Sequence, residues 1–337
     1  MSLLKVNQLR VYYKTKKGVV RAVDGVSFEV EEGETFGIVG ESGCGKSTIA
    51  KAIIKIFPKN AFIAFGNIIY KGKDLIEMNE SELNDIRWKE ISIIPQNAMN
   101  TLDPVYKVGS QIVEAIKRHE KVSKGEAWNR SLTLFQMVGL DTECLKVYPH
   151  QLSGGMRQRV IIAMALALQP SLIIADEPTT ALDVITQGQI LREFKERREK
   201  FAIALIFITH DISVIAETCD KVAVMYAGRF MEYGNLRDII KTPYHPYTMG
   251  LKNSFTSIDV YHEKLISIPG FPPDLIGSSR GCLFLGRCPF SERICQEDPE
   301  IIEAGPGHYS ACHFPDRVEE FRSRATLEET WIGKNIL

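Results

Sequence analysis

The sequence lacks the features that mark membrane-spanning, secreted or nucleic-acid-binding chains. Its most apolar stretches, at 161–168 and 201–209, are much shorter than the roughly 18 residues needed to cross a bilayer. The first six residues lack the apolar segment of a signal peptide. The net charge of −1, from 41 Lys and Arg against 42 Asp and Glu, argues against a strongly basic nucleic-acid surface. We therefore expect a chain that does not span a membrane and that, if it serves one, docks on proteins that do.

Internal repeats and low-complexity tracts are also absent, so solenoid and fibrous architectures are excluded. The 337 residues are enough for one large domain with an appendage, or for two domains. Hydrophobic residues make up 45% and charged residues 25% of the chain, as in ordinary globular proteins. The sequence therefore predicts a globular protein with a sizeable core.

The order of apolar segments predicts an α/β fold. Alternating apolar residues indicate strands at 9–13 and 19–30, and a short apolar strand at Thr35–Val39 precedes a helix at 47–56. Later strands are expected at 172–175, 203–209 and 222–226, with helices at 156–168 and 187–200. Apolar strands that alternate with helices are typical of a parallel sheet. The more polar stretch 97–147 is predicted to be helical, and the region after residue 250 to be rich in loops.

Residues 40–47 read GESGCGKS and fit the pattern G-x-x-x-x-G-K-[ST] between a predicted strand and a helix. Glycines let successive backbone N–H groups point at phosphate oxygens, and the following helix adds the positive end of its dipole. The lysine supplies a charge for the β- and γ-phosphates, and the serine a hydroxyl for Mg²⁺. A glycine-rich turn without a ligand is the alternative, which the flanking strand and helix disfavour. The predicted ATP contacts are Ser42, Gly43, Cys44, Gly45, Lys46, Ser47 and Thr48.

Two carboxylates end the apolar strand at 172–175. Asp176 is predicted to hold the Mg²⁺ shell, and Glu177 to polarise the water that attacks the γ-phosphate. Strand-end acids are often merely solvated, so this pair gains its meaning from the phosphate loop upstream.

A second phosphate cradle is predicted at Ser153, Gly154 and Gly155, at the head of an apolar helix. The glycines let backbone N–H groups approach a phosphate, and the serine adds a hydroxyl. Because one nucleotide rarely needs two cradles, we expect the second to serve the nucleotide of a partner chain. An ordinary helix cap at Ser153 is the plainer interpretation, and both can hold together.

With these motifs in this order, residues 3–247 resemble the ATP-binding-cassette (ABC) family. The resemblance implies a P-loop NTPase fold: a RecA-like parallel sheet, an N-terminal antiparallel β subdomain and a helical subdomain at about 97–165 that carries the signature motif. It also implies roles for residues outside the two cradles. These are Tyr13 for stacking on adenine, Gln96 for sensing Mg²⁺, Asp183 in the D-loop, and His210 for contacting the γ-phosphate. Tyr12, the neighbour of Tyr13, is the alternative adenine contact.

Four of the seven cysteines fall within 31 residues near the C-terminus: Cys282, Cys288, Cys295 and Cys312. Four thiolates suit Zn²⁺ or an iron–sulfur cluster. The uneven spacing lacks the paired C-x₂-C of zinc ribbons and favours a larger cluster; free thiols and disulfides are further alternatives. The segment 242–248 and the pattern at 281–289 resemble the C-terminal extension of dipeptide/oligopeptide importer ATPases, some of which carry a [4Fe–4S] cluster. We therefore divide the chain into a nucleotide-binding domain at 1–250 and a small cysteine-rich extension at 251–337.

The function predicted from this resemblance is an ATPase that energises an importer for di- and oligopeptides or related solutes such as oligosaccharides. The implied partners are a second cassette, either a paralogue or an identical chain, two transmembrane permease subunits and, indirectly, an extracellular solute-binding protein. The implied location is peripheral, on the cytoplasmic face of the cell membrane, with no nucleic acid bound. The alternative is a soluble ABC ATPase acting on DNA or ribosomes. A single phosphate loop, no long heptad run and a near-neutral charge disfavour it.

Overall fold

The computed structural model of the chain describes residues 2–96, 101–178, 187–188, 191–192, 202–254, 266–277 and 280–332. It divides into two compact units. Unit 1 contains Met1–Leu3, Val30–Glu34 and Asp74–Phe207, and unit 2 contains Leu4–Glu29, Thr35–Lys73 and Ile208–Leu337. Among the described residues, no helix combines the length and apolar character needed to span a membrane.

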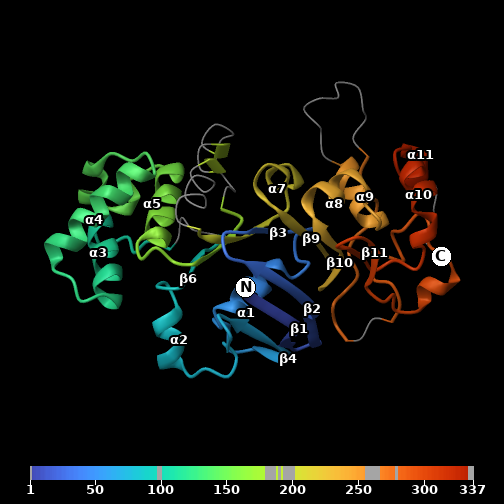
Figure 1. Cartoon of the computed structure of the whole chain (residues 1–337), viewed down its shortest axis with the longest axis horizontal. Helices are drawn as coiled ribbons and strands as arrows, with labels where there is room; N and C mark the ends of the chain where they lie inside the picture. Colours follow the sequence, from blue (N-terminus) through green and yellow to red (C-terminus); the bar gives the residue numbers. More distant parts are fainter. Residues whose placement is uncertain are drawn as a thin grey trace. The chain divides into compact units, whose positions relative to one another are not determined.

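Unit 1 is mainly helical. Its helices are α2 (Glu80–Ile86), α3 (Val108–His119), α4 (Lys124–Met137), the 3₁₀ turns η2 (Thr142–Lys146) and η3 (Pro149–Gln151), and α5 (Gly154–Leu166). Its strands are β6 (Ile91–Ile94), β7 (Leu172–Asp176) and most of β8 (Ala204–Thr209), in the order β6-β7-β8. Figure 1 shows α3, α4 and α5 packed side by side. The predicted helical character of 97–147 is thus confirmed for its described part.

Apolar side chains at helical spacing explain this packing. Ile112 and Ile116 of α3 and Phe135 of α4 are fully buried, and Ser123 caps α4 by accepting the N–H of Glu126. The middle of α5, from Val160 onward, is buried all round. Burial of this kind stabilises a helix far more than intrinsic propensity does.

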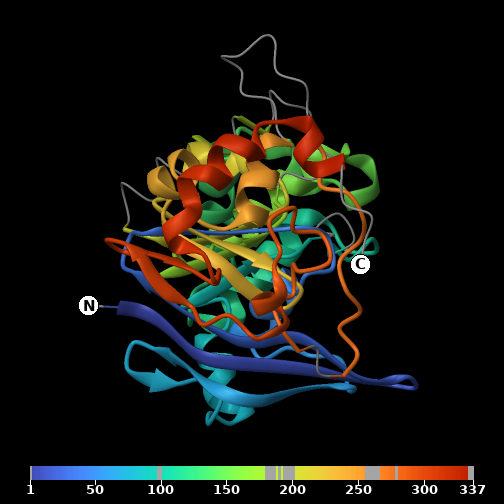
Figure 2. The same cartoon turned by 90° about the vertical axis from the view of Figure 1, so that its right-hand side faces the viewer.

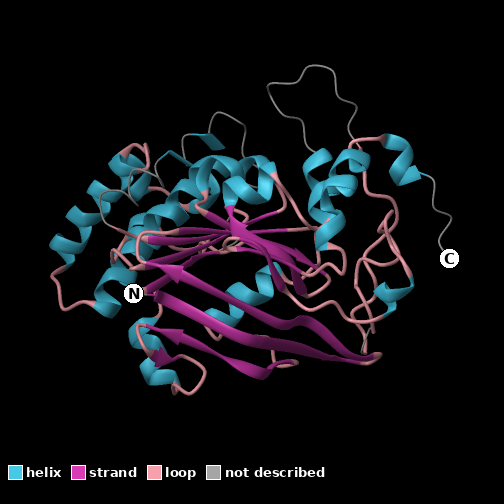
Figure 3. Ribbon diagram, turned by 45° about the vertical axis from the view of Figure 1, so that its right-hand side comes forward, coloured by secondary structure: helices cyan, strands magenta, loops and turns pink. Residues whose placement is uncertain are grey.

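Unit 2 contains two groups of strands. β1 (Ser2–Thr15), β2 (Gly18–Glu31), β4 (Ala61–Tyr70) and β5 (Lys73–Asp74) form a sheet in the order β2-β1-β4-β5. The long strands of this antiparallel group run side by side in Figures 2 and 3. The second group has the order β11-β12-β10-β9-β3, from β3 (Thr35–Val39), β9 (Lys221–Tyr226), β10 (Arg229–Asn235), β11 (Ile302–Gly305) and β12 (His308–Ser310). The expected antiparallel β subdomain near the N-terminus is therefore confirmed.

The expectation of a parallel sheet needs correction, because the pairing is mixed. β3 pairs with β9 and β6 with β7 in parallel, whereas β10 is antiparallel to both β9 and β12. The cause is the two-residue turn between β9 and β10. Ala227 and Gly228 both have positive φ there, of 48° and 87°, which is the geometry of a tight hairpin.

The helices of unit 2 are short. They are α1 (Lys46–Ile53), α7 (Ile212–Thr218), α8 (Leu236–Lys241), α9 (Pro246–Asn253), α10 (Val318–Ala325) and α11 (Glu328–Ile332), with the 3₁₀ turns η4 (Arg293–Gln296) and η5 (Pro315–Arg317). The predicted helix at 47–56 ends earlier than expected, at Ile53. Lys55 adopts a φ of 51°, and the N–H groups of Lys55 and Ile56 bond back to Ala52 and Lys51, which closes the helix.

The region after residue 250 contains its own buried aromatic cluster. Phe290 stacks on Phe321 with ring centroids 4.2 Å apart, and Phe284 and Trp331 are also buried. The sequence alone shows a thin hydrophobic run in this region, which predicts that its order depends on a metal centre. That expectation understated the core, because the aromatic residues are scattered in sequence and meet only in the fold. Loops and short helices still dominate this segment, drawn orange to red in Figure 2.

Buried hydrogen bonds join residues 244–245 and β12 to β10 in the sheet of unit 2. The carboxylate of Glu232 on β10 is fully buried and accepts the backbone N–H groups of Tyr244 and His245 and a contact from His308 Nε2 on β12. His245 Nδ1 accepts the N–H of Tyr247 at the start of α9. Burial lowers the pKa of His245 to about 3, so this ring is neutral and free to accept.

Candidate nucleotide site

The phosphate loop connects β3 to α1, as the motif requires. β3 is buried along its whole length, and α1 begins at Lys46 with Gly45 as its N-terminal cap residue. No side chain caps this helix start, and no acidic residue lies in its first turn. The backbone N–H groups at the start of α1 are therefore oriented to bind an anion.

Two glycines are required by the shape of the loop. Gly40 has a φ of 159°, and a Cβ there would lie 2.0 Å from the carbonyl oxygen of Met225. Gly45 has a φ of 111°, and its Cβ would lie 2.0 Å from the carbonyl oxygen of Ala22. Both contacts are with backbone, which cannot move aside easily. The loop can thus approach β9 and β2 only if these two residues have no side chain.

Lys46 is folded back over the loop. Its side chain is buried, and Nζ donates to the carbonyl oxygens of Gly40 and Glu41 at 2.7 and 2.9 Å. Cys44 Sγ lies 3.7 Å from the same nitrogen. Cys44 is itself buried, and desolvation raises the pKa of its thiol despite the nearby lysine charge. The buried Cys44 side chain fills space beneath the loop, while Ser42 and Gly43 are exposed at the loop tip.

The two neighbouring tyrosines of β1 have different partners. The hydroxyl of Tyr13 lies 3.2 Å from Thr48 Oγ1, in the first turn of α1. The hydroxyl of Tyr12 donates to Asp24 at 2.7 Å, and its ring meets Phe62 edge-on. Tyr13 is therefore the tyrosine that reaches the phosphate-loop helix, and Tyr12 is engaged within the antiparallel sheet.

His210 follows β8 and is exposed. The next residue, Asp211, accepts the N–H of Ser213 and so starts α7. A buried strand that ends at an exposed histidine suits a contact with a bound ligand.

In unit 1, Gln96, Asp176 and Glu177 gather at one sheet edge. β6 and β7 are parallel, with Ile94 opposite Ala175, so the residues that follow each strand are neighbours. Asp176 is buried, whereas Glu177 is half-buried and Gln96 exposed. Glu177 has a φ of 50°, a conformation that residues other than glycine adopt infrequently and that is enriched at functional sites.

Ser153 caps α5, as the plainer interpretation predicted. Its Oγ accepts the N–H of Met156 at 3.3 Å, and Gly154 and Gly155 form the first turn. Ser153 remains exposed, and no acidic residue lies in the first turn of the helix. Asp183 of the expected D-loop lies outside the described residues, as does most of the predicted helix at 187–200.

The four C-terminal cysteines line one cavity, together with His245 and the buried aromatic residues. Desolvation raises the pKa of Cys282 to about 11 and that of Cys312 to about 12, and the thiols raise one another's values further. Among the described residues, however, no group of three or more His, Cys, Asp or Glu has the arrangement of a metal-ion site. The four sulfurs line one cavity, but among the described residues they do not form a preformed metal-ion site.

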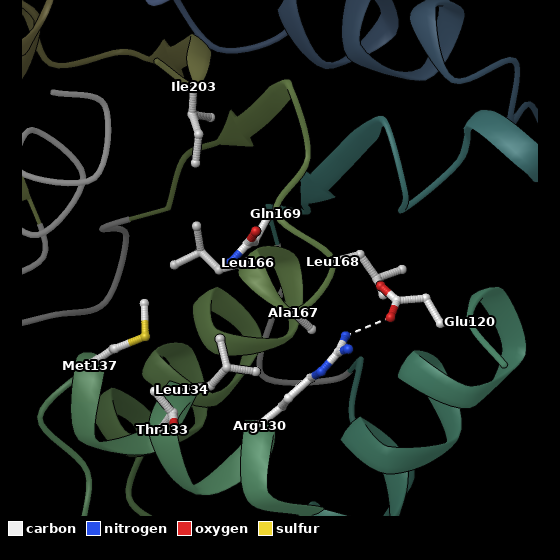
Figure 4. Close-up of a pocket in the computed structure, with 10 residues that line it drawn as sticks. All are labelled: Glu120, Arg130, Thr133, Leu134, Met137, Leu166, Ala167, Leu168, Gln169 and Ile203. Carbon is white, nitrogen blue, oxygen red and sulfur yellow. Dashed lines mark hydrogen bonds and ion pairs between the residues drawn. The ribbon is translucent and has the colours of Figure 1, made fainter. Parts of the chain in front are cut away.

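A separate pocket of about 480 Å³ lies in unit 1 and contains none of the predicted site residues. Its lining includes Leu134, Leu166 and Ile203, and the ion pair of Arg130 with Glu120 lies at its side (Figure 4). The pocket adjoins the C-terminal end of α5, about 20 Å along the helix from the cap at Ser153. It is therefore distinct from the second phosphate cradle.

Comparison with known proteins shows the family of the chain. Residues 23–180 match the ABC transporter family, and residues 231–295 match the oligopeptide/dipeptide transporter C-terminal region. The chain is 46% identical to the oligopeptide transport ATP-binding protein OppD of Escherichia coli over 95% of its length and 94% of that protein. This chain belongs to the oligopeptide/dipeptide group of ABC transporter ATP-binding proteins.

Other ABC proteins extend the likeness. The dipeptide transport ATP-binding protein DppD of Bacillus subtilis is 48% identical over 87% of this chain and 88% of that protein. Among solved structures, the ABC cassette MJ0796, a dimer in a post-hydrolysis state bound to ADP and Pi, has a TM-score of 0.64. It is 28% identical and covers 69% of this chain and 99% of that one. The family inferred from the motifs is therefore confirmed.

Contacts from distant parts of the chain hold residues of this site, and the motifs did not predict them. Glu41, within the phosphate loop, is bonded by Arg287 and Tyr247 of the C-terminal half. Gln158 on α5 donates to the carbonyl oxygen of Pro178, directly after Glu177. Each of these contacts joins a polar residue to a partner far away in the sequence. A single sequence contains no signal for such a pairing.

Proposed function

We propose that the chain is the ATP-hydrolysing subunit of an importer for di- and oligopeptides or related solutes. The observation that carries this proposal is the match of residues 231–295 to the oligopeptide/dipeptide transporter C-terminal region, on the same chain as the ABC match. The relatives named above are themselves peptide-transport ATP-binding proteins. No feature of the described residues favours the alternative of a soluble ATPase acting on DNA or ribosomes.

In this proposal the phosphate loop binds ATP. Backbone N–H groups of residues 42–48 surround the β- and γ-phosphates, and Lys46 exchanges its contacts with the loop carbonyls for contacts with phosphate. Tyr13 stacks on adenine, since its hydroxyl already lies beside Thr48. Oxygen donors suit Mg²⁺, and Ser47, Gln96 and Asp176 are the residues that would hold it.

Hydrolysis is assigned to residues that follow buried strands. Glu177 accepts a proton from the attacking water, and its φ of 50° is of the kind enriched at functional sites. His210 contacts the γ-phosphate, and Gln96, beside Glu177 at the sheet edge, reports whether Mg²⁺ and nucleotide are bound. In-line attack on the γ-phosphate then releases phosphate and leaves ADP.

The second cradle is proposed to act on the nucleotide of a partner cassette. Ser153, Gly154 and Gly155 stand exposed or half-exposed at a helix start. The ABC cassette MJ0796 was solved as a dimer, which supports such an arrangement. The partner is either a paralogue or an identical chain. Closure of two cassettes on two ATP molecules is the step that consumes binding energy.

The remaining partners are two transmembrane permease subunits and, through them, an extracellular solute-binding protein. The chain would lie peripherally on the cytoplasmic face of the membrane and contact the permeases through the helical region around residues 97–150, near Gln96. Residues 1–250 would form the nucleotide-binding domain and 251–337 the extension. No contact with nucleic acid is part of the proposal.

We further propose that the cysteine cavity holds a [4Fe–4S] cluster, with zinc as the less favoured occupant. The support is the donor set: Cys282, Cys288, Cys295 and Cys312 line the same cavity. Four thiolates bound to one cluster would cross-link residues 282–312, a structural role. Protein purified without oxygen should contain iron and sulfide and absorb visible light. Colourless protein with one zinc per chain would contradict the cluster.

The transport function is tested in proteoliposomes that contain the chain together with its co-purified membrane subunits. Lys46→Ala should abolish both MgATP hydrolysis and uptake of a labelled oligopeptide, since the phosphate charge loses its partner. Lys51→Ala, which changes an exposed lysine on the same helix, is the matched control and should retain both. Peptide uptake that continues in the Lys46→Ala complex would refute the proposal.

A further inference from the structure

The C-terminal half of the chain holds the phosphate loop at Glu41 through both its side chain and its main chain. Both carboxylate oxygens of Glu41 accept Arg287 Nη1, each at 2.9 Å. The backbone N–H of the same residue donates to the hydroxyl of Tyr247 at 3.0 Å. Side chain and main chain are thus both fixed, at the position whose carbonyl oxygen also accepts Lys46 Nζ.

Arg287 is itself fixed on all sides. Its Nε donates to Pro269 O at 2.9 Å, Nη2 to Ile268 O at 3.3 Å, and Nη1 also to the hydroxyl of Tyr226 at 3.2 Å. Its side chain is only 8% exposed. A guanidinium so nearly removed from water, with one carboxylate as its ionic partner, binds strongly and directionally.

The position of Arg287 links two parts of the molecule. It follows Gly286 and precedes Cys288, in a turn whose N–H groups at 287 and 288 both bond to Phe284 O at 2.9 Å. The turn packs through Phe284 on Tyr226 and Tyr247. The rim of the cysteine cavity and the phosphate loop are therefore joined by one side chain.

We propose that Arg287 is a positioning residue for nucleotide: through Glu41 it sets the shape of the phosphate loop, so that the C-terminal extension controls the affinity for MgATP. This inference depends on the proposed function, because the loop must bind nucleotide. An ion pair that only stabilised the fold would leave nucleotide affinity unchanged. The pair here acts on the residue between Gly40 and Ser42, where a shift of the backbone changes the direction of the phosphate-binding N–H groups.

The test measures the dissociation constant for MgATP and the KM and kcat of hydrolysis in the full chain, purified in its complex. Arg287→Ala should weaken MgATP binding and raise KM by at least about tenfold, with a smaller change in kcat. Arg287→Lys should recover part of the affinity, because an ammonium can still bond one carboxylate oxygen. Arg317→Ala is the matched control, since Arg317 forms exposed ion pairs with Glu292 and Glu320 and should bind as the unchanged chain does.

Glu41→Gln provides an independent arm that retains the shape of the side chain, should Arg287→Ala fail to fold. It should also weaken MgATP binding, and adding Arg287→Lys to it should cause little further loss, because both act through one contact. Folded Arg287→Ala or Glu41→Gln protein that binds MgATP within twofold of the unchanged chain would overturn the inference. Failure of the unchanged chain to bind MgATP would instead contradict the proposed function.

Discussion

The starts of α1 and α5 are both proposed to bind phosphate. They differ in how many contacts from the chain hold each of them. Both helices begin next to glycine and have no acidic residue in the first turn. The loop before α1 is enclosed: Lys46 folds over it, and Arg287 and Tyr247 hold it from outside. At the start of α5, Ser153 caps the helix and is exposed, and Gly154 and Gly155 are half-exposed.

The difference supports the role proposed for each helix start. An enclosed loop can bind the phosphates of a nucleotide without a partner chain, because its hydrogen-bond donors are oriented before binding. An exposed helix start offers donors but no enclosure, so it suits a phosphate that is already held elsewhere. This is the division of work expected when two cassettes share each nucleotide.

The largest effect should come from the enclosed loop. In Gly45→Ala the new Cβ would meet the carbonyl oxygen of Ala22, in a backbone conformation that alanine rarely adopts. We expect MgATP binding to fall below detection by titration calorimetry. Gly154→Ala is the paired change at the start of α5. It should leave binding to the isolated chain within about twofold, and equal losses in both variants would remove the distinction between the two helix starts.

A large effect on turnover, with none on binding, is expected at Glu177. Glu177→Gln retains the shape of the side chain but removes the base, so hydrolysis should slow by about 100-fold or more. The affinity for MgATP should be unchanged, and the assembled complex should accumulate with two cassettes closed. Steady-state hydrolysis at the rate of the unchanged protein would show that another group is the base.

A smaller effect is expected at Tyr13. Loss of a stacked ring in Tyr13→Ala should weaken MgATP binding by roughly tenfold, in line with about 1–3 kcal/mol per stacked base. Tyr12→Ala is the matched control and should change affinity little, because Tyr12 contacts Asp24 and Phe62 within the antiparallel sheet. If the two variants exchange these effects, the adenine contact belongs to Tyr12.

The parts of the fold that were predictable from sequence are local. The strand, loop and helix at 35–53 follow from an apolar run, a glycine pattern and helix-forming residues, all within 20 positions. The same holds for the cap at Ser153 and for the strand that ends at Asp176. In each case the sequence neighbours of the motif are also its structural context, so one stretch of sequence contains the whole signal.

The parts that were missed depend on pairs distant in sequence. Arg287 and Glu41 are separated by 246 positions, and each alone looks like a solvated surface charge. The aromatic core of the extension was not predicted, because Phe290 and Phe321 are also distant in sequence and stack only after the chain folds. The antiparallel pairing of β10 with β9 was missed because a two-residue turn at Ala227 and Gly228, not the apolar pattern, decides the direction of β10.

The most direct test of the account is to identify which polypeptide supplies each side of the pocket. The measurement is an experimental structure of the assembled transporter carrying Glu177→Gln, trapped with MgATP, with distances from the γ-phosphate to every helix start. The account predicts that the nucleotide held by Lys46 is contacted by the signature helix of the other cassette, and that Ser153 of this chain contacts the other nucleotide. A γ-phosphate bonded by both Lys46 and Ser153 of the same chain would contradict it.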